Sequence, residues 1–145
     1  MEQAKIQAFG DELYEAMIKR EAVSPLTSRG EDIRINDAYH ISLRMLERRL
    51  ADGASIIGKK IGVTSKAVQN MLNVHQPDFG YLTDDMVFNS GEVMPISDRL
   101  IAPRAEGEIA FILKKDLTGP GVTNADVLAA TECVMPCFEI VDSRI

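Results

Sequence analysis

Two glutamates one residue apart, with a third farther along the chain, are the side chains best suited to chemistry. Glu106 and Glu108 lie in the segment 104–111, whose alternating apolar residues predict a β-strand. Because alternate residues of a strand share a face, their carboxylates are expected to point the same way, roughly 6.6 Å apart at the backbone. That spacing lets both side chains reach one ion.

The third carboxylate, Glu139, lies in a later apolar segment, residues 135–141, which also predicts a strand. Three inward carboxylates on neighbouring strands repel one another unless a cation holds them. Oxygen ligands favour a hard cation, and the two cysteines, Cys133 and Cys137, lack zinc-type spacing and partner ligands. The alternative is the solvated face of a half-exposed sheet, where neighbouring glutamates are common.

A lysine on a glycine-rich strand is the next candidate. Residues 56–63 predict a short strand on which Lys60 shares a face with Gly58 and Gly62. With nothing bulky on either side, its ammonium group has access to a ligand carboxylate. The alternative is an edge-strand lysine that prevents aggregation.

An ordered loop over a pocket is predicted at residues 73–82, which mix turn formers with aromatic residues. Within it, Asp78 is a candidate base or orienting acceptor, and the alternative is a plain turn residue. Short apolar segments at 86–88 and 92–94, on either side of Asn89-Ser-Gly91, predict a hairpin.

Helices are expected to support these segments. An apolar stripe predicts a helix over residues 2–21, and a second helix is expected to begin at Asp37 as its N-cap and to run to about Leu50, with Gly53 as the stop. The second helix is predicted to carry Ile41, Met45 and Leu46 inward. Its arginines are predicted to form an outward, solvated face: Arg44, Arg48 and Arg49.

Two shorter helices complete the expected elements. Thr64 or Ser65 is expected to cap a helix that runs through Leu72. Thr123 with Asp126 resembles a capping box for a helix to about Glu132.

The composition bounds the class of protein. The sequence has 145 residues, 46% hydrophobic and 26% charged, which suits a globular domain with a real core. The net charge of −6 disfavours a nucleic-acid partner, and no apolar run is long enough to cross a membrane. A single pair of cysteines indicates reduced, buried thiols and a cytoplasmic setting.

The last residues, 140–145, are typical of a strand in progress, so the chain is expected to be the N-terminal portion of something longer. The expected fold class is α+β.

Four segments together resemble the 2-hydroxypenta-2,4-dienoate (2-oxopent-4-enoate) hydratases of the fumarylacetoacetate hydrolase-like superfamily. The resemblance runs in order from near residue 10 to the end of the chain. The segments that carry it are Gly58-Lys-Lys-Ile-Gly-Val-Thr-Ser65, Gln76-Pro-Asp-Phe-Gly-Tyr-Leu82, Pro103-Arg-Ala-Glu-Gly-Glu-Ile-Ala-Phe111 and Glu139-Ile-Val-Asp-Ser-Arg144.

The resemblance implies that residues 1–54 form a helical N-terminal part. It implies that residues 55–145 form the first portion of a metal-binding domain, a mixed β-roll of this superfamily that is incomplete at residue 145. It implies addition of water to a 2-hydroxydienoate in aromatic meta-cleavage catabolism, and homo-oligomers that can pair with 4-oxalocrotonate decarboxylase. It also implies Mg²⁺ or Mn²⁺ on three glutamates and a substrate pocket with three further residues. The ligands would be Glu106, Glu108 and Glu139, the catalytic and substrate-binding residues Lys60 and Asp78, and the residue against the substrate chain Leu72.

Two alternatives remain open from the sequence. One is 4-oxalocrotonate decarboxylase, which resembles the hydratases closely and uses the same metal and a similar enol. The other is a non-catalytic fragment that only assembles with a partner. Assays with both substrates, and the intact mass, would separate the three.

Overall fold

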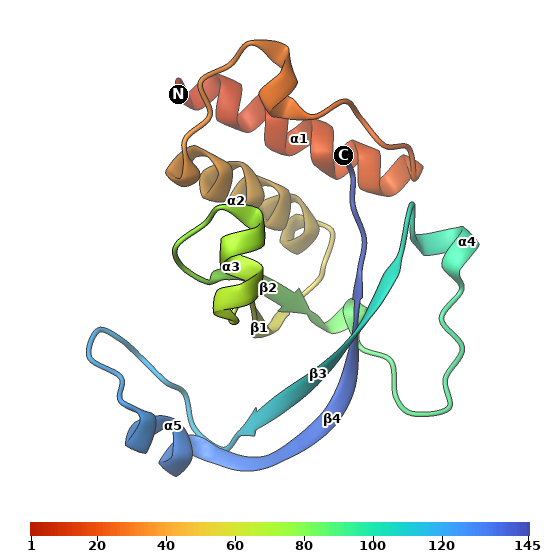
Figure 1. Cartoon of the computed structure of the whole chain (residues 1–145). Coiled ribbons are helices and arrows are strands. Elements are labelled where there is room, and N and C mark those ends of the chain that lie inside the picture. Colours follow the sequence, from red (N-terminus) through yellow and green to blue (C-terminus); the bar gives the residue numbers. More distant parts are fainter. The chain divides into compact units, whose positions relative to one another are not determined.

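The computed structural model describes residues 1–145, which form helices and small antiparallel sheets in two compact units (Figure 1). One unit comprises Met1–Arg99 with Arg144–Ile145, and the other comprises Leu100–Ser143. The predicted α+β class is confirmed. The division at residue 54 stays a prediction. None of the helices has the length and apolar character needed to cross a membrane.

The first unit is built on two long helices, α1 (Gln3–Lys19) and α2 (Ile35–Ala51), joined through a 3-10 turn, η1 (Leu26–Arg29). Their apolar stripes meet in a small core, and both helices were predicted from those stripes. Three core side chains are only 5%, 7% and 2% exposed: Ile6, Leu26 and Ile41.

Two details predicted for α2 are wrong. The helix begins at Ile35 with Arg34 as its N-cap, and Asp37, three residues on, accepts a hydrogen bond from the Arg34 N–H at 3.0 Å. The arginine face is not solvated either. Arg44 and Arg48 are half-buried and both donate to Asp11 of α1, at 2.9 and 3.0 Å. These ion pairs could not be predicted from local sequence patterns, because the partners lie more than 30 residues apart.

A hairpin follows the helices. Strand β1 (Ile56–Gly62) pairs antiparallel with β2 (Asp78–Thr83), and α3 (Lys66–Leu72) lies between them in sequence. Ser65 caps α3, as one of the two predicted caps, by accepting from the Val68 N–H at 3.2 Å. The loop predicted over 73–82 is wrong at its second half, because residues 78–83 find a pairing partner in β1.

The hairpin predicted around residues 86–94 is also wrong. The segment contains a 3-10 turn, η2 (Asp84–Met86), and a turn in which the Glu92 carboxylate accepts from the Asn89 N–H at 2.6 Å. A short helix, α4 (Ile96–Arg99), follows. Two or three apolar residues on each side of a turn do not make strands without a sheet to join.

The second unit is a long two-stranded antiparallel sheet, β3 (Arg104–Leu113) and β4 (Thr131–Val141), with α5 (Asn124–Ala130) in the connection (Figure 1). The predicted Thr123–Asp126 capping box is confirmed, although α5 ends at Ala130 rather than near Glu132. Both cysteines lie free on β4, and Cys133 is exposed, so the prediction of buried thiols is wrong for that residue.

Candidate functional site

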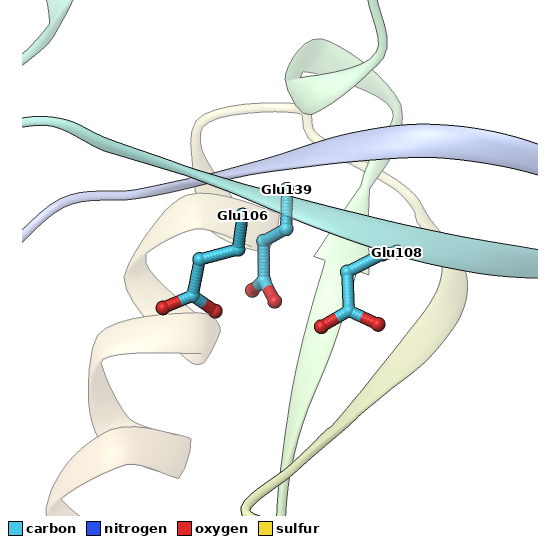
Figure 2. A group of neighbouring side chains, drawn as sticks. All are labelled: Glu106, Glu108 and Glu139. Carbon is cyan, nitrogen blue, oxygen red and sulfur yellow. The ribbon is translucent and has the colours of Figure 1, made fainter.

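The three predicted glutamates come together on the second unit. Glu106 of β3 lies directly opposite Glu139 of β4, and Glu108 follows two residues along the same face of β3. One carboxylate oxygen from each lies within 4.8 Å of those of the other two. Figure 2 shows the three side chains pointing to one side of the sheet, with their carboxylates gathered.

The register of the two strands is what creates this cluster. Arg104 pairs with Val141 at one end, and beyond it Asp142 accepts hydrogen bonds from the backbone N–H groups of Ile101 and Ala102, at 3.0 and 2.7 Å. A slip of one residue would turn Glu139 to the other face of the sheet. Asp142 therefore helps to fix the alignment on which the carboxylates depend.

The donor set suits a hard dication. Glu106 and Glu108 are exposed and Glu139 is half-buried, so the cluster remains open to water and to a ligand. Mg²⁺ prefers carboxylate oxygens and keeps several exchangeable positions. Three like charges this close repel one another, and a cation between them would remove that repulsion. Cys137 pairs with Glu108 across the sheet and shares its face, but it is not among the three clustered ligands.

Lys60 and Asp78 are neighbours on the first unit. Lys60 pairs with Gly80 and Asp78 pairs with Gly62, so all four residues share one face of the β1–β2 hairpin. A Cβ placed on Gly62 would contact Asp78 Oδ1 and lie 2.9 Å from Lys60 Nζ. The ammonium and the carboxylate therefore lie on either side of one small space. The predicted face of Lys60 is confirmed, and Asp78 stands on a strand rather than in a loop.

Leu72, the remaining predicted pocket residue, is the last residue of α3 and is 53% exposed. The helix ends there because Asn73 adopts the left-handed conformation, with φ of 54°. The contact of Leu72 with a substrate stays a prediction, as do the ligand and catalytic roles of the other five residues.

Three residues that fix the local structure near these side chains were not predicted to do so from the sequence. Gly80 lies beneath Lys60, Asp142 clamps the start of β3, and Arg49 of α2 joins the end of β2. The glycine at the centre of Phe79-Gly-Tyr81 was the one available signal, because glycine inside a strand often marks a close approach. The partners of the other two are distant in sequence.

The fold of this chain matches that of a solved enzyme. It is similar to 4-oxalocrotonate decarboxylase from Pseudomonas putida G7, solved with magnesium and adipate and also with calcium and acetate. Against each of these structures the TM-score is 0.92 and the identity 31%, over 99% of this chain and 54% or 55% of the other. The chain thus shares its fold with a decarboxylase that has been solved with divalent metals.

The sequence relatives are hydratases. The chain is 79% identical over 145 residues to a 2-hydroxypent-2,4-dienoate hydratase of Pseudomonas putida, and 62% identical over 141 residues to a 2-hydroxyhexa-2,4-dienoate hydratase of Comamonas testosteroni. It covers 65% and 53% of those proteins, so it spans about half to two thirds of the length of these curated relatives.

A more distant relative is a 2-oxo-hept-4-ene-1,7-dioate hydratase of Escherichia coli, 41% identical over 132 residues, which are 91% of this chain and 49% of that protein. No family model matches the chain. The predicted resemblance to the 2-hydroxypenta-2,4-dienoate hydratases is confirmed by these relatives.

Proposed function

We propose that this chain provides the metal-binding part of a hydro-lyase that adds water to 2-hydroxypenta-2,4-dienoate and gives 4-hydroxy-2-oxopentanoate in aromatic meta-cleavage catabolism. The observation that carries the proposal is the convergence of three carboxylates within 4.8 Å in a chain 79% identical to a hydratase named for this substrate. The β-roll expected for the superfamily is part of the same proposal.

Mg²⁺ or Mn²⁺ is the proposed cofactor, held by Glu106, Glu108 and Glu139. The oxygen-only donor set and its open side fit either ion. When bound, the dication supplies Lewis acidity towards the carboxylate and 2-oxygen of the substrate. The three glutamates contribute negative charge that holds the ion and leave its remaining positions to water and substrate.

The first unit would contribute the charges that handle the organic acid. The Lys60 ammonium is proposed to neutralise the substrate carboxylate or the charge that develops on its 2-oxygen during ketonisation. The Asp78 carboxylate is proposed to accept or orient a proton during ketonisation and water addition. Leu72 is proposed to line the path of the substrate's carbon chain, because an apolar side chain suits an apolar tail.

The experiment that tests the proposal compares Glu106→Gln and Glu108→Gln of β3 with a matched control, Glu132→Gln, which changes an exposed glutamate of β4 outside the cluster. Hydration of the dienoate is measured as the loss of its ultraviolet absorbance. Mn²⁺ binding is measured by electron paramagnetic resonance. We expect either cluster variant to lose at least about 100-fold in rate and to bind Mn²⁺ more weakly. Wild-type turnover in a cluster variant would refute the metal assignment.

The second candidate function is 4-oxalocrotonate decarboxylation, favoured by the fold match to that enzyme at a TM-score of 0.92. The hydratase has the stronger support, because its relatives reach 79% identity against 31% for the decarboxylase. Incubation of the purified protein with each substrate separates the two. Release of carbon dioxide from 4-oxalocrotonate without hydration of the pentadienoate would reverse the choice.

The proposed setting is cytoplasmic, in a homo-oligomer that can form a complex with 4-oxalocrotonate decarboxylase. Size-exclusion chromatography with light scattering, with and without the decarboxylase, measures both associations. An intact mass near 16.0 kDa together with no activity in added Mn²⁺ would favour the remaining alternative, a fragment that works only with a partner.

A further inference from the structure

Three glycines share one face of the β1–β2 hairpin with Lys60, and they differ in what surrounds them. A Cβ at Gly80 would lie 3.2 Å from Lys60 Cγ and 3.4 Å from Lys60 Cδ. A Cβ at Gly62 would lie 2.9 Å from Lys60 Nζ and would also collide with Asp78 Oδ1. A Cβ at Gly58 would meet only Leu82 Cδ1, at an ordinary contact distance of 3.9 Å.

These distances trace the course of the lysine side chain. Its aliphatic stem lies over Gly80, directly across the strand pair, and its ammonium group ends over Gly62 on its own strand. Asp78, directly opposite Gly62, brings its carboxylate to the same place. Gly62 and Gly80 have no side chains, and the space this leaves is occupied by the Lys60 side chain and the Asp78 carboxylate.

Backbone conformation does not explain why these positions are glycine. Gly62 and Gly80 have no positive φ, unlike Gly53 or Gly91 with φ of 103° and 90°, so an alanine could adopt their backbone without strain. The requirement therefore comes from the space that Lys60 and Asp78 occupy.

We propose that Gly62 and Gly80 are positioning residues, which hold the Lys60 ammonium beside the Asp78 carboxylate in the geometry that the reaction uses. The proposal rests on the function proposed above for Lys60 and Asp78. A methyl group at Gly62 would displace both charged groups, and one at Gly80 would shift the lysine stem by a few tenths of an ångström. The displaced atoms are parts of flexible side chains, so the fold would survive while the charged pair moved.

The first measurement is independent of activity. Chemical shifts of Lys60 ¹³Cε and Asp78 ¹³Cγ are recorded for the wild type, Gly62→Ala, Gly80→Ala and the matched control Gly58→Ala. We expect both signals to move in Gly62→Ala, the lysine signal alone to move in Gly80→Ala, and neither to move in Gly58→Ala. Melting temperatures should stay within about 3 °C of the wild type in all three.

The second measurement is kinetic. We expect kcat/KM for hydration to fall about 10- to 100-fold in Gly62→Ala, about 3-fold in Gly80→Ala, and less than twofold in Gly58→Ala, because small misplacements of a reacting group are costly. A Cβ at Gly80 would meet only Lys60 atoms within 4 Å, so Gly80→Ala should cause no further loss once Lys60→Ala is present. Repeating the double change with Lys59→Ala, whose side chain lies on the opposite face over Tyr81, should leave the 3-fold loss intact.

The outcomes separate this inference from the proposed function. Unmoved Lys60 and Asp78 signals in Gly62→Ala would overturn the inference, whatever the protein catalyses. Equal losses from Gly80→Ala with and without Lys60 would overturn it as well, since a purely structural role predicts additivity. If the signals move in Gly62→Ala but the wild-type protein hydrates no dienoate, the positioning of the pair is supported and the proposed function is refuted.

Discussion

The two hairpins of this molecule hold their charged residues in different ways. In β1–β2, helix α2 lies against one end of the sheet. Arg49 of α2 donates to Thr83, which is completely buried, and Tyr39 stacks on Phe79 with ring centroids 4.8 Å apart. In β3–β4, long apolar side chains remain exposed along both strands, with Phe138 at 77%.

The difference shows what positions each group. Lys60 is placed by packing, because its stem fills the space that Gly80 leaves. The glutamates are placed by register, because Glu106 and Glu139 meet across the strand pair and Asp142 clamps the neighbouring backbone. Substitutions that leave the strands aligned should therefore alter charge alone in β3–β4, whereas in β1–β2 they should alter both contacts and geometry.

The largest expected effect tests the three glutamates that the β3–β4 register brings together. Glu139→Gln removes one of three converging charges, so Mn²⁺ affinity should fall about 100-fold. Without a dication the same change should raise the melting temperature by about 1–3 °C, because like charges facing each other across strands are destabilising. Mn²⁺ binding and melting curves with and without chelator measure both.

The control for this experiment is Glu132→Gln on the same strand, which should change neither quantity. A Glu139→Gln protein that melts lower than the wild type in chelator would show that the carboxylate stabilises the hairpin by contacts. In that case the contrast between the two hairpins would fail.

The next effect tests the packed hairpin. Arg49→Met keeps the apolar stem but removes the donor to Thr83 at 2.9 Å and to Asp85 at 2.6 and 2.8 Å. The arginine side chain is only 11% exposed, so its loss should cost about 2–3 kcal/mol of unfolding free energy. Urea unfolding followed by circular dichroism measures the change.

Arg34→Met is the matched comparison, because the Arg34 side chain is 80% exposed and its ion pair with Asp32 is long, at 3.8 Å. That change should stay within about 0.5 kcal/mol. Equal losses from the two arginines would mean that Arg49 does not join α2 to β2 in the way its contacts indicate.

The sequence predicted the parts whose signals are local. Alternation placed Glu106 and Glu108 on one face of a strand, and the glycine pattern placed Lys60 with Gly58 and Gly62. Helix α1 and the capping box before α5 followed from short patterns in the same way. None of these needed knowledge of a distant partner.

Two of the errors arose where a partner distant in sequence decides the structure. Residues 78–83 form a strand because β1 is available to pair with them, and Gly80 leaves the space in which the Lys60 stem lies. The arginines of α2 were expected in solvent because Asp11 is more than 30 residues away. Physical neighbours of this kind leave no local pattern.

The smallest effect concerns the ion pairs that Asp11 of α1 makes with Arg44 and Arg48 of α2. Hydrogen bonds from Arg44, and then from Arg48, hold the pKa of Asp11 below its ordinary value of 3.8. A carboxyl group whose pKa is lowered by folding stabilises the fold above its unfolded pKa and loses that contribution as pH falls through the folded value. Asp11→Asn should therefore lower the melting temperature by about 1–3 °C at pH 7, a small change because the pair is partly solvated.

The pH dependence distinguishes this charge effect from a packing effect. Below about pH 3.8 the wild type loses the contribution of Asp11, so the two melting curves should converge as the pH is lowered from 7 to 2. Asp32→Asn, at a carboxylate whose side chain is 88% exposed, should match the wild type throughout. A gap between Asp11→Asn and the wild type that stays constant to pH 2 would mean that Asp11 acts by shape rather than charge. The α1–α2 contact would then be held by packing, as the β1–β2 hairpin is, and not by its ion pairs.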